Sequence, residues 1–226
     1  MLRLSPSLPR AGRVSIRATL PAVLALFVAP SLAAAPQTPE VSFEAASSTV
    51  GEADAAHQVR VLLSEVGASD VTIEYTVSGT ASGGGVDYTE TTASPLVISV
   101  GSLEGLIDLT VVDDALDELD ETVILTLGNI TGGTAGATLE HTVSLTDDDD
   151  SPTVEFQAAT GSAGEATGPV TIDVTLSAVS GLDVTVPFTV SGTATDIDDF
   201  SLDASPLVIP AGGATGTLTL LSLIHI

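Results

Sequence analysis

Apolar and polar residues alternate along most of the chain after residue 35, so that every second side chain is apolar. In the segment VTIEYTV at 71–77, valine, isoleucine and tyrosine alternate with threonine and glutamate. A period of two places the apolar side chains on one face of a β-strand. The same pattern predicts seven strands, at residues 41–47, 57–63, 71–77, 94–100, 103–112, 122–127 and 138–146. Seven short strands in about 110 residues predict an antiparallel β-sandwich of immunoglobulin-like size.

This strand pattern occurs twice. The segment VSFEAAS at 41–47 returns as VEFQAAT at 154–160, and SGTA also occurs in both copies. Such internal similarity predicts tandem modules, which we place at residues 36–150 (the first repeat) and 151–226 (the second repeat). The second match stops near Leu220, before the segment that would correspond to the last two strands. We therefore expect an all-β chain of two immunoglobulin-like antiparallel β-sandwiches, the second one truncated.

The first 35 residues have the features of a secretory signal peptide. Four arginines precede an apolar run at 18–28, and small residues follow at 31–35. A basic start, a short apolar core and small residues near a cleavage point are typical of exported proteins. No later segment approaches the ~20 apolar residues that a membrane-spanning helix needs. We expect the mature chain to be secreted or held at the cell surface, without direct insertion into the membrane.

The chain is strongly acidic. Aspartate and glutamate number 30 against 5 basic residues, which gives a formal net charge of −25 over 226 residues. A surface of this sign repels nucleic-acid phosphates, so the sequence excludes nucleic acid as a partner and favours cations. Cysteine is absent, which excludes disulfides, thiolate metal sites and cysteine nucleophiles.

The acidic residues are concentrated in particular loops. If consecutive strands run in opposite directions, the loops after the first, third, fifth and seventh strands of the first repeat meet at one end of the sandwich. These loops contain fourteen acidic residues: Glu52, Asp54, Asp87, Glu90, Asp113, Asp114, Asp117, Glu118, Asp120, Glu121, Asp147, Asp148, Asp149 and Asp150. The loops at the other end contain only Glu65 and Asp70. Carboxylates this crowded repel one another, and a bound cation would offset the repulsion.

Calcium is the cation that this arrangement favours. It takes about 6–8 oxygen ligands in irregular geometry, whereas magnesium keeps more water and fewer carboxylates. The three histidines, His57, His141 and His225, are scattered along the sequence, which argues against zinc or copper. Two alternatives stay open: solvated acidic loops without a ligand, and an acidic sandwich adapted to high salt without a specific metal.

The motifs of the first repeat resemble those of the Calx-beta domain family. The matching segments are VSF with Gly51-Glu52, SGTA followed by VDY at 86–88, DDALDELDET at 113–122 and LTDDD at 145–149. The resemblance implies a calcium site formed by Glu52, Asp87, Asp113, Asp114, Glu118, Glu121, Asp147, Asp148 and Asp149, together with the main-chain carbonyl of Leu116. In the second repeat only Glu165, Asp198 and Asp199 keep such positions, and we expect no tight calcium binding there.

Enzymatic chemistry finds little support in the sequence. The loop at 113–121 lacks the apolar pocket that a glycosidase acid requires, and the chain has no Gly-x-Ser-x-Gly turn. We expect His141 to be an outward polar residue of its strand. Aromatic residues that repeat in register are expected in the cores, as the pairs Phe43/Phe156, Tyr75/Phe188 and Tyr88/Phe200.

The sequence therefore predicts a non-catalytic, calcium-binding β-sandwich of an exported surface or adhesion protein, in which Ca²⁺ stiffens the acidic loops and the junction between the repeats. The expected partners are calcium ions, neighbouring modules and cell-surface molecules. The alternatives are spacer modules of a larger secreted hydrolase, or a salt-adapted sandwich without a specific metal.

Overall fold

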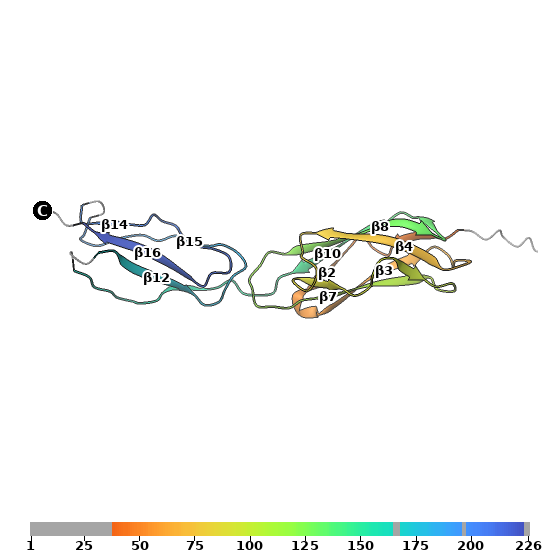
Figure 1. Ribbon diagram of the computed structural model, residues 1–226, viewed down its shortest axis with the longest axis horizontal. Coiled ribbons are helices and arrows are strands. Elements are labelled where there is room, and N and C mark those ends of the chain that lie inside the picture. Colours follow the sequence, from red (N-terminus) through yellow and green to blue (C-terminus); the bar gives the residue numbers. More distant parts are fainter. Residues whose placement is uncertain (1–37, 165–167, 196–197, 224–226) are drawn as a thin grey trace, which may run out of the picture. The chain divides into compact units, whose positions relative to one another are not determined.

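The computed structural model describes residues 38–164, 168–195 and 198–223, and nearly all regular structure in them is β-strand (Figure 1). The predicted all-β class is confirmed. One short 3-10 turn, η1 (Glu52–Asp54), interrupts the strands. No helix among the described residues is long and apolar enough to cross a membrane. The predicted signal peptide at 1–35 lies outside the described residues and stays a prediction.

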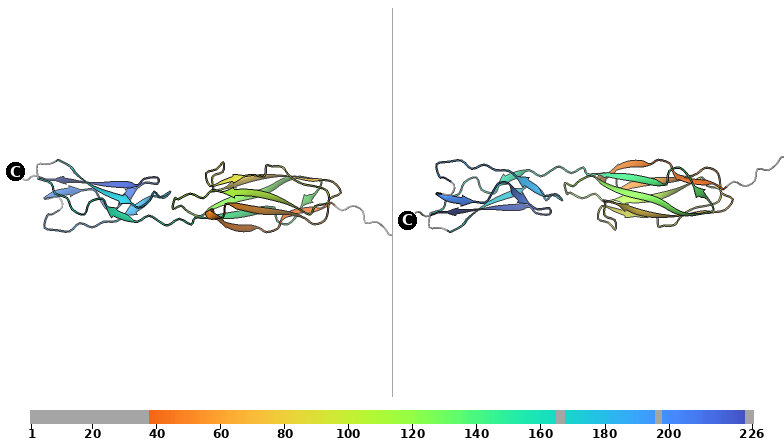
Figure 2. Two further views of the ribbon diagram at one scale, coloured as in Figure 1. Left: turned by 90° about the horizontal axis from the view of Figure 1, so that it is seen from below. Right: turned by 90° about the horizontal axis from the view of Figure 1, so that it is seen from above.

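The first repeat is a sandwich of two five-stranded sheets. Its strands are β1 (Glu40–Phe43), β2 (Ser47–Gly51), β3 (Ala56–Leu63), β4 (Val71–Gly79), β5 (Tyr88–Glu90), β6 (Leu96–Ile98), β7 (Glu104–Val111), β8 (Glu121–Thr131), β9 (Thr134–Ala135) and β10 (Glu140–Thr146). One sheet has the order β5-β7-β3-β1-β9 and the other β2-β10-β8-β4-β6. Figure 2 shows the strands of this repeat from two opposite sides. Most neighbouring strands are antiparallel, but β9 runs parallel to β1, and β2 runs parallel to β10.

Two segments of the first repeat change sheet without reversing direction. β1 pairs with β3 in one sheet, and after Glu44–Ala46 the chain enters the other sheet as β2, beside β10. Likewise β5 pairs with β7, and the chain continues as β6 beside β4. The sequence predicted one strand at 41–47 in place of β1 and β2, and one at 94–100 that omits β5. Since neither change of sheet reverses the chain, the loops still reach the predicted ends.

The core of the first repeat is formed by inward-facing residues of both sheets. Val61, Ile73, Ile107, Leu125 and Val143 are completely buried. Buried residues alternate with more exposed ones along β4, β8 and β10, as the period of two predicted.

Aromatic residues and one histidine complete this core. The predicted core positions are confirmed for Phe43, Tyr75 and Tyr88. The prediction for His141 was wrong, because its side chain is only 4% exposed and lies on the inward face of β10, in phase with Val143. Its ring packs against Phe43 with the centroids 5.5 Å apart, and both ring nitrogens have hydrogen-bond partners. Because both nitrogens are hydrogen-bonded, burial of this polar ring does not carry the free-energy cost of an unpaired polar group.

The second repeat contains two smaller sheets. β11 (Val154–Phe156), β12 (Val170–Leu176), β16 (Thr215–Ser222) and β14 (Phe200–Leu202) form one, while β13 (Val184–Val186) and β15 (Leu207–Ile209) form the other. These strands correspond in order to β1-β3-β7-β5 and β4-β6 of the first repeat. The described residues of the second repeat contain no counterpart of β2, β8 or β10.

The smaller sheets leave part of the second core uncovered. Phe156 is 56% exposed, whereas its counterpart Phe43 is 2% exposed. The predicted core position is therefore wrong for Phe156, since the strands that cover Phe43 have no counterpart there. Phe188 is partly buried, and Phe200 is buried as predicted.

Candidate metal centre

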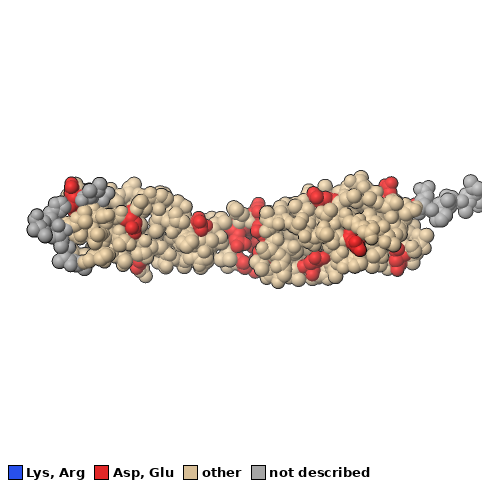
Figure 3. Space-filling model, turned by 45° about the horizontal axis from the view of Figure 1, so that its top comes forward, with Lys and Arg blue, Asp and Glu red and all other residues tan. Residues whose placement is uncertain are grey.

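Four acidic segments of the first repeat converge at one end of the sandwich. Glu52 follows β2, Asp87 precedes β5, residues 113–121 join β7 to β8, and residues 147–149 follow β10. Strand pairing causes part of this convergence, because β2 and β10 run parallel over five register pairs and end together. Figure 3 shows acidic side chains gathered at this end, with no lysine or arginine among the described residues on the face in view.

Three carboxyl groups lie close enough to share one ion. Single carboxylate oxygens of Glu52, Asp114 and Asp149 all lie within 4.8 Å of one another. Asp147 Oδ1 and Asp149 Oδ2 are buried and have no hydrogen-bond partner among the described residues. A buried carboxylate oxygen without a donor is costly, and contact with a cation would remove that cost.

Glu52 is surrounded by other negative charges. Burial raises its pKa from 4.5 to about 7, and the charges of four neighbours add to the effect: Asp147, Asp114, Glu118 and Asp149. Burial also raises the pKa of Glu118, with further contributions from the same group of carboxylates. Both shifts arise because a charged carboxylate is disfavoured where water is excluded and like charges are near. Without a cation, the cluster therefore retains protons close to neutral pH.

Asp87 and Glu121 extend the same cluster. Burial raises the pKa of Glu121 to about 7, and a hydrogen bond between its side chain and that of Asp87 contributes to the shift. The main-chain N–H of Ser82 donates to the Asp87 carboxylate and thereby fixes the loop before β5. Glu121 therefore keeps a proton close to neutral pH while no cation is bound.

Asp113 and Asp148 lie at the margin of the cluster. Burial raises the pKa of Asp149, and the charges of Asp147, Asp148, Asp114 and Asp113 raise it further. The N–H of Leu116 donates to Asp114 Oδ1 at 2.8 Å, which turns the start of the loop back on itself. All nine predicted carboxylates thus interact electrostatically within one group. Their role as ligands, and that of the Leu116 carbonyl, stays a prediction.

Other acidic residues assigned to this end have separate partners. Glu90 accepts a hydrogen bond from Tyr75 Oη. Asp54 Oδ2 accepts from the Gly51 N–H at 3.0 Å, and Asp117 Oδ1 accepts from Ser151 Oγ at 2.8 Å. Counting strand directions therefore finds the correct end of the sandwich. It does not distinguish members of the cluster from acidic residues beside it.

The chemistry of the cluster fits calcium. All its groups are hard oxygen donors, and the clustered residues of the described structure include neither histidine nor thiolate. Calcium accepts several carboxylates in irregular geometry, whereas zinc selects nitrogen and sulfur ligands. The buried oxygens of Asp147 and Asp149 are those that most need a cation. A Ca²⁺ ion would thus be held by Glu52, Asp114, Asp147 and Asp149.

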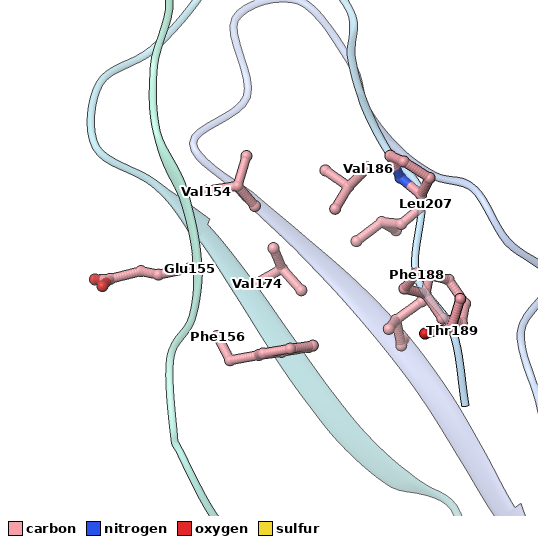
Figure 4. A pocket seen from close by; sticks show the side chains of 10 residues that line it. Val154, Glu155, Phe156, Val174, Val186, Phe188, Thr189 and Leu207 are labelled. Carbon is pink, nitrogen blue, oxygen red and sulfur yellow. The ribbon is translucent and has the colours of Figure 1, made fainter. Parts of the chain in front are cut away.

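The second repeat offers a different kind of site. A hollow of about 650 Å³ is lined mainly by apolar side chains, including Val154, Phe156, Val174 and Leu207. Figure 4 shows these side chains around the hollow, while Glu155 points away from it. This lining is the uncovered core described above, and it carries no cluster of polar groups that could perform chemistry.

Comparison with models of known protein families shows which family the chain belongs to. A sequence model of the Calx-beta domain matches residues 36–149 and again 147–220. The chain belongs to the Calx-beta domain family. The two Calx-beta matches meet close to the predicted boundary between the repeats, and the division into two domains at that boundary stays a prediction. Among curated proteins, no relative matches the chain.

Several solved structures resemble this Calx-beta chain. The calcium binding domain CBD12 of CALX1.1 is 26% identical, with 83% of this chain and 77% of that chain covered and a TM-score of 0.45. CBD12 from CALX1.2 is 24% identical, with coverages of 83% and 76% and a TM-score of 0.43. The apo form of the Calx CBD1 domain is 28% identical over 50% of this chain and 100% of that chain, with a TM-score of 0.44.

Proposed function

We propose that the first repeat is a non-catalytic calcium-binding module. One observation carries this proposal: Asp147 Oδ1 and Asp149 Oδ2 are buried without a donor from the described residues, and an Asp149 oxygen lies within 4.8 Å of carboxylate oxygens of Glu52 and Asp114. The elevated pKa of Glu52 reports the same excess of negative charge. Membership of the Calx-beta family supports calcium as the ion.

The role of the ion in this proposal is mechanical. Calcium draws together the loops that follow β2, β7 and β10, which repel one another while they are charged and metal-free. The loop at 113–121 also contacts the junction between the repeats, because Ser151 Oγ donates to Asp117 next to Glu118. Ordering of this loop would therefore stiffen the junction. The proposed setting is an exported protein at the cell surface that acts in adhesion, with calcium, neighbouring modules and surface molecules as partners.

Thermal unfolding in different ions tests calcium binding. Tyrosine fluorescence follows the first repeat alone, since the chain has no tryptophan and both tyrosines, Tyr75 and Tyr88, lie in that repeat. Samples in EDTA, in about 2 mM magnesium and in about 2 mM calcium are compared at constant ionic strength. Calcium alone should raise the midpoint, because a ligand at a hundredfold excess over Kd stabilises the folded state by about 2.7 kcal/mol.

Variants locate the effect. Asp114→Asn and Glu118→Gln should remove most of the calcium response, while Glu140→Gln, an exposed change at the other end of β10, should keep it. Identical unfolding curves in all three media would contradict the proposal. Equal stabilisation by sodium or potassium at matched ionic strength would favour the salt-adapted sandwich.

A further inference from the structure

A second group of titratable side chains joins the two sheets of the first repeat, apart from the acidic cluster. His57 lies on β3 in one sheet, and Ser48 and His141 lie on the adjacent strands β2 and β10 of the other. Ser48 Oγ is 2.8 Å from His57 Nε2 and 2.7 Å from His141 Nε2. One hydroxyl group therefore connects two imidazole rings across the sandwich. We call these three residues the Ser48 bridge.

The contacts of the Ser48 bridge fix the position of every proton. His141 Nδ1 lies 2.7 Å from the carbonyl oxygen of Ala45, and a carbonyl only accepts, so Nδ1 carries a proton. In the neutral ring Nε2 is then the acceptor, and Ser48 Oγ–H donates to it. Ser48 Oγ in turn accepts from His57 Nε2–H. The Ser48 hydroxyl needs an acceptor, and only an imidazole whose Nε2 carries no proton supplies one.

Protons on both rings together would break this chain of hydrogen bonds. A proton on His57 alone enters at Nδ1, outside the bridge, and a proton on His141 Nε2 alone is accommodated when His57 changes tautomer and accepts from the Ser48 hydroxyl. With both rings protonated, both Nε2 atoms are donors and the hydroxyl has no acceptor. Two positive charges would then lie close together, one of them in a side chain that is only 4% exposed.

The surroundings of the Ser48 bridge offer little compensation for that charge. Burial lowers the pKa of His57, and the nearby His141 lowers it further, while the Asp54 carboxylate of η1 acts in the opposite direction. That carboxylate already accepts a hydrogen bond from the Gly51 N–H. The remaining neighbours are uncharged: the ring of Phe43, the Ala45 carbonyl, and the cross-strand partners Leu109 and Leu125.

We propose that the Ser48 bridge is an acid-sensitive lock on β2, closed while at least one imidazole is neutral and opened when both are protonated. β2 is an edge strand that pairs only with β10 in its sheet, so the bridge supplies its hydrogen-bonded link to the opposite sheet among the described residues. The His141 contact with Ala45 also fixes the segment where the chain changes sheet. Glu52 follows β2 directly, so release of β2 would free the main chain that carries this carboxyl group.

Amide hydrogen exchange of residues 44–51 tests the lock. The full chain is measured in EDTA at pH 7.5 and 5.5, with correction for the intrinsic pH dependence of exchange. Stability that depends on a neutral imidazole is lost as the pH falls below 6.5. Relative to a variant without the two imidazoles, protection of this segment should therefore fall by about 2- to 12-fold at pH 5.5, which corresponds to the loss of one hydrogen bond.

Histidine and serine variants make the test specific. The double variant His57→Gln/His141→Gln has no imidazole in the bridge, so its protection should change with pH only through the acidic residues, whereas His225→Gln should behave as the wild type. Ser48→Ala should exchange rapidly already at pH 7.5.

If the double variant does not fold, His57→Gln alone keeps an N–H donor at a partly exposed position and should show a reduced pH response. Equal pH responses in the wild type and the histidine variants, or wild-type protection in Ser48→Ala, would overturn the proposal. Acidic residues titrate in all samples alike, so their effect cancels in the comparison.

Discussion

Asp87 lies beside Glu121, and its side chain adds to the effect of burial in raising the pKa of Glu121 to about 7. The proton that Glu121 holds near neutral pH must leave before both groups can act as anionic ligands. Glu52 retains a proton near neutral pH for a related reason, since burial and four neighbouring carboxylates disfavour its charge. Protons and the proposed calcium ion would therefore compete for the same end of the first repeat.

The metal-free first repeat should become less stable as the pH rises from about 4.5 to about 7. Glu52 and Glu121 have a pKa of about 7 in the folded chain and 4.5 ordinarily, so the folded state holds protons that the unfolded state has released. Their contribution to stability is complete below 4.5 and is lost as the pH passes through 7. Urea unfolding in EDTA at several pH values, followed by tyrosine fluorescence, measures this slope.

Variants separate this slope from other titrations. Glu52→Gln should have a smaller loss of stability over this interval than the wild type, and Glu140→Gln should have the same loss. Calcium affinity should rise over the same interval, since proton release precedes binding. A wild-type slope in Glu52→Gln would contradict the assignment of the titration to this cluster.

Asp147→Asn should have opposite effects with and without calcium. Removal of one charge from the crowded, metal-free cluster should raise the free energy of unfolding by about 1 kcal/mol, the repulsion between two charges about 4 Å apart in water. The same change removes a buried oxygen that would contact the ion, so calcium should stabilise this variant less than the wild type. Asp150→Asn, at an exposed position three residues later, serves as the control and should keep the calcium response. Destabilisation of Asp147→Asn in EDTA would contradict the proposed repulsion.

Phe43→Ala should destabilise the first repeat by about 3–5 kcal/mol, as expected for the loss of a fully buried phenylalanine. Phe156→Ala, at the corresponding position of the second repeat, removes a side chain that is 56% exposed. It should leave the tyrosine-detected transition unchanged. Equilibrium unfolding in urea compares both variants with the wild type, and equal losses would show that the difference in exposure has no energetic consequence.

Gly79→Ala should be much more damaging than Gly101→Ala, although both glycines have a positive φ. A Cβ at Gly79, where φ is +134°, would lie 2.0 Å from the carbonyl oxygen of Thr122, whereas one at Gly101, where φ is +94°, meets nothing within 4 Å. Gly101→Ala should cost about 1–2 kcal/mol from backbone strain alone. Gly79→Ala adds the collision at the start of β8, next to Glu121, and should also weaken the calcium response. Similar unfolding midpoints for the two variants would contradict this argument.

The end of the sandwich that carries the acidic cluster could be predicted from the sequence, even though the predicted strands did not separate β2 from β1 and left out β5 and the two-residue β9. β2 runs in the same direction as β1 before it, and β5 runs in the same direction as β6 after it. Leaving out β2 and β5 therefore does not change which end of the sandwich each loop is assigned to. Alternating apolar residues report strand direction and burial, and these two properties suffice to group the loops.

The membership of the cluster could not be predicted in the same way. Glu90 and Glu121 are both acidic residues of the same set of loops, yet one contacts Tyr75 and the other contacts Asp87. That distinction depends on side-chain direction at the end of a strand. The position of His141 did have a signal, because it alternates in phase with Val143 and Leu145 and therefore belongs to the inward face. Its contact with Ser48 depends on the pairing of distant strands, which alternation alone does not specify.

The parallel pairing of β2 with β10 has a consequence for chains under tension. A pull on the two ends of the first repeat would draw β2 toward the N-terminus and β10 toward the C-terminus. Because the strands run parallel over five register pairs, from Thr142 with Ser47 to Thr146 with Gly51, the pull acts along the strands, across all their hydrogen bonds at once. In this direction the bonds must break together, in shear, whereas in an antiparallel hairpin they would open one after another. The β2–β10 pairing should therefore resist a pull along the chain more strongly than a hairpin with the same number of hydrogen bonds.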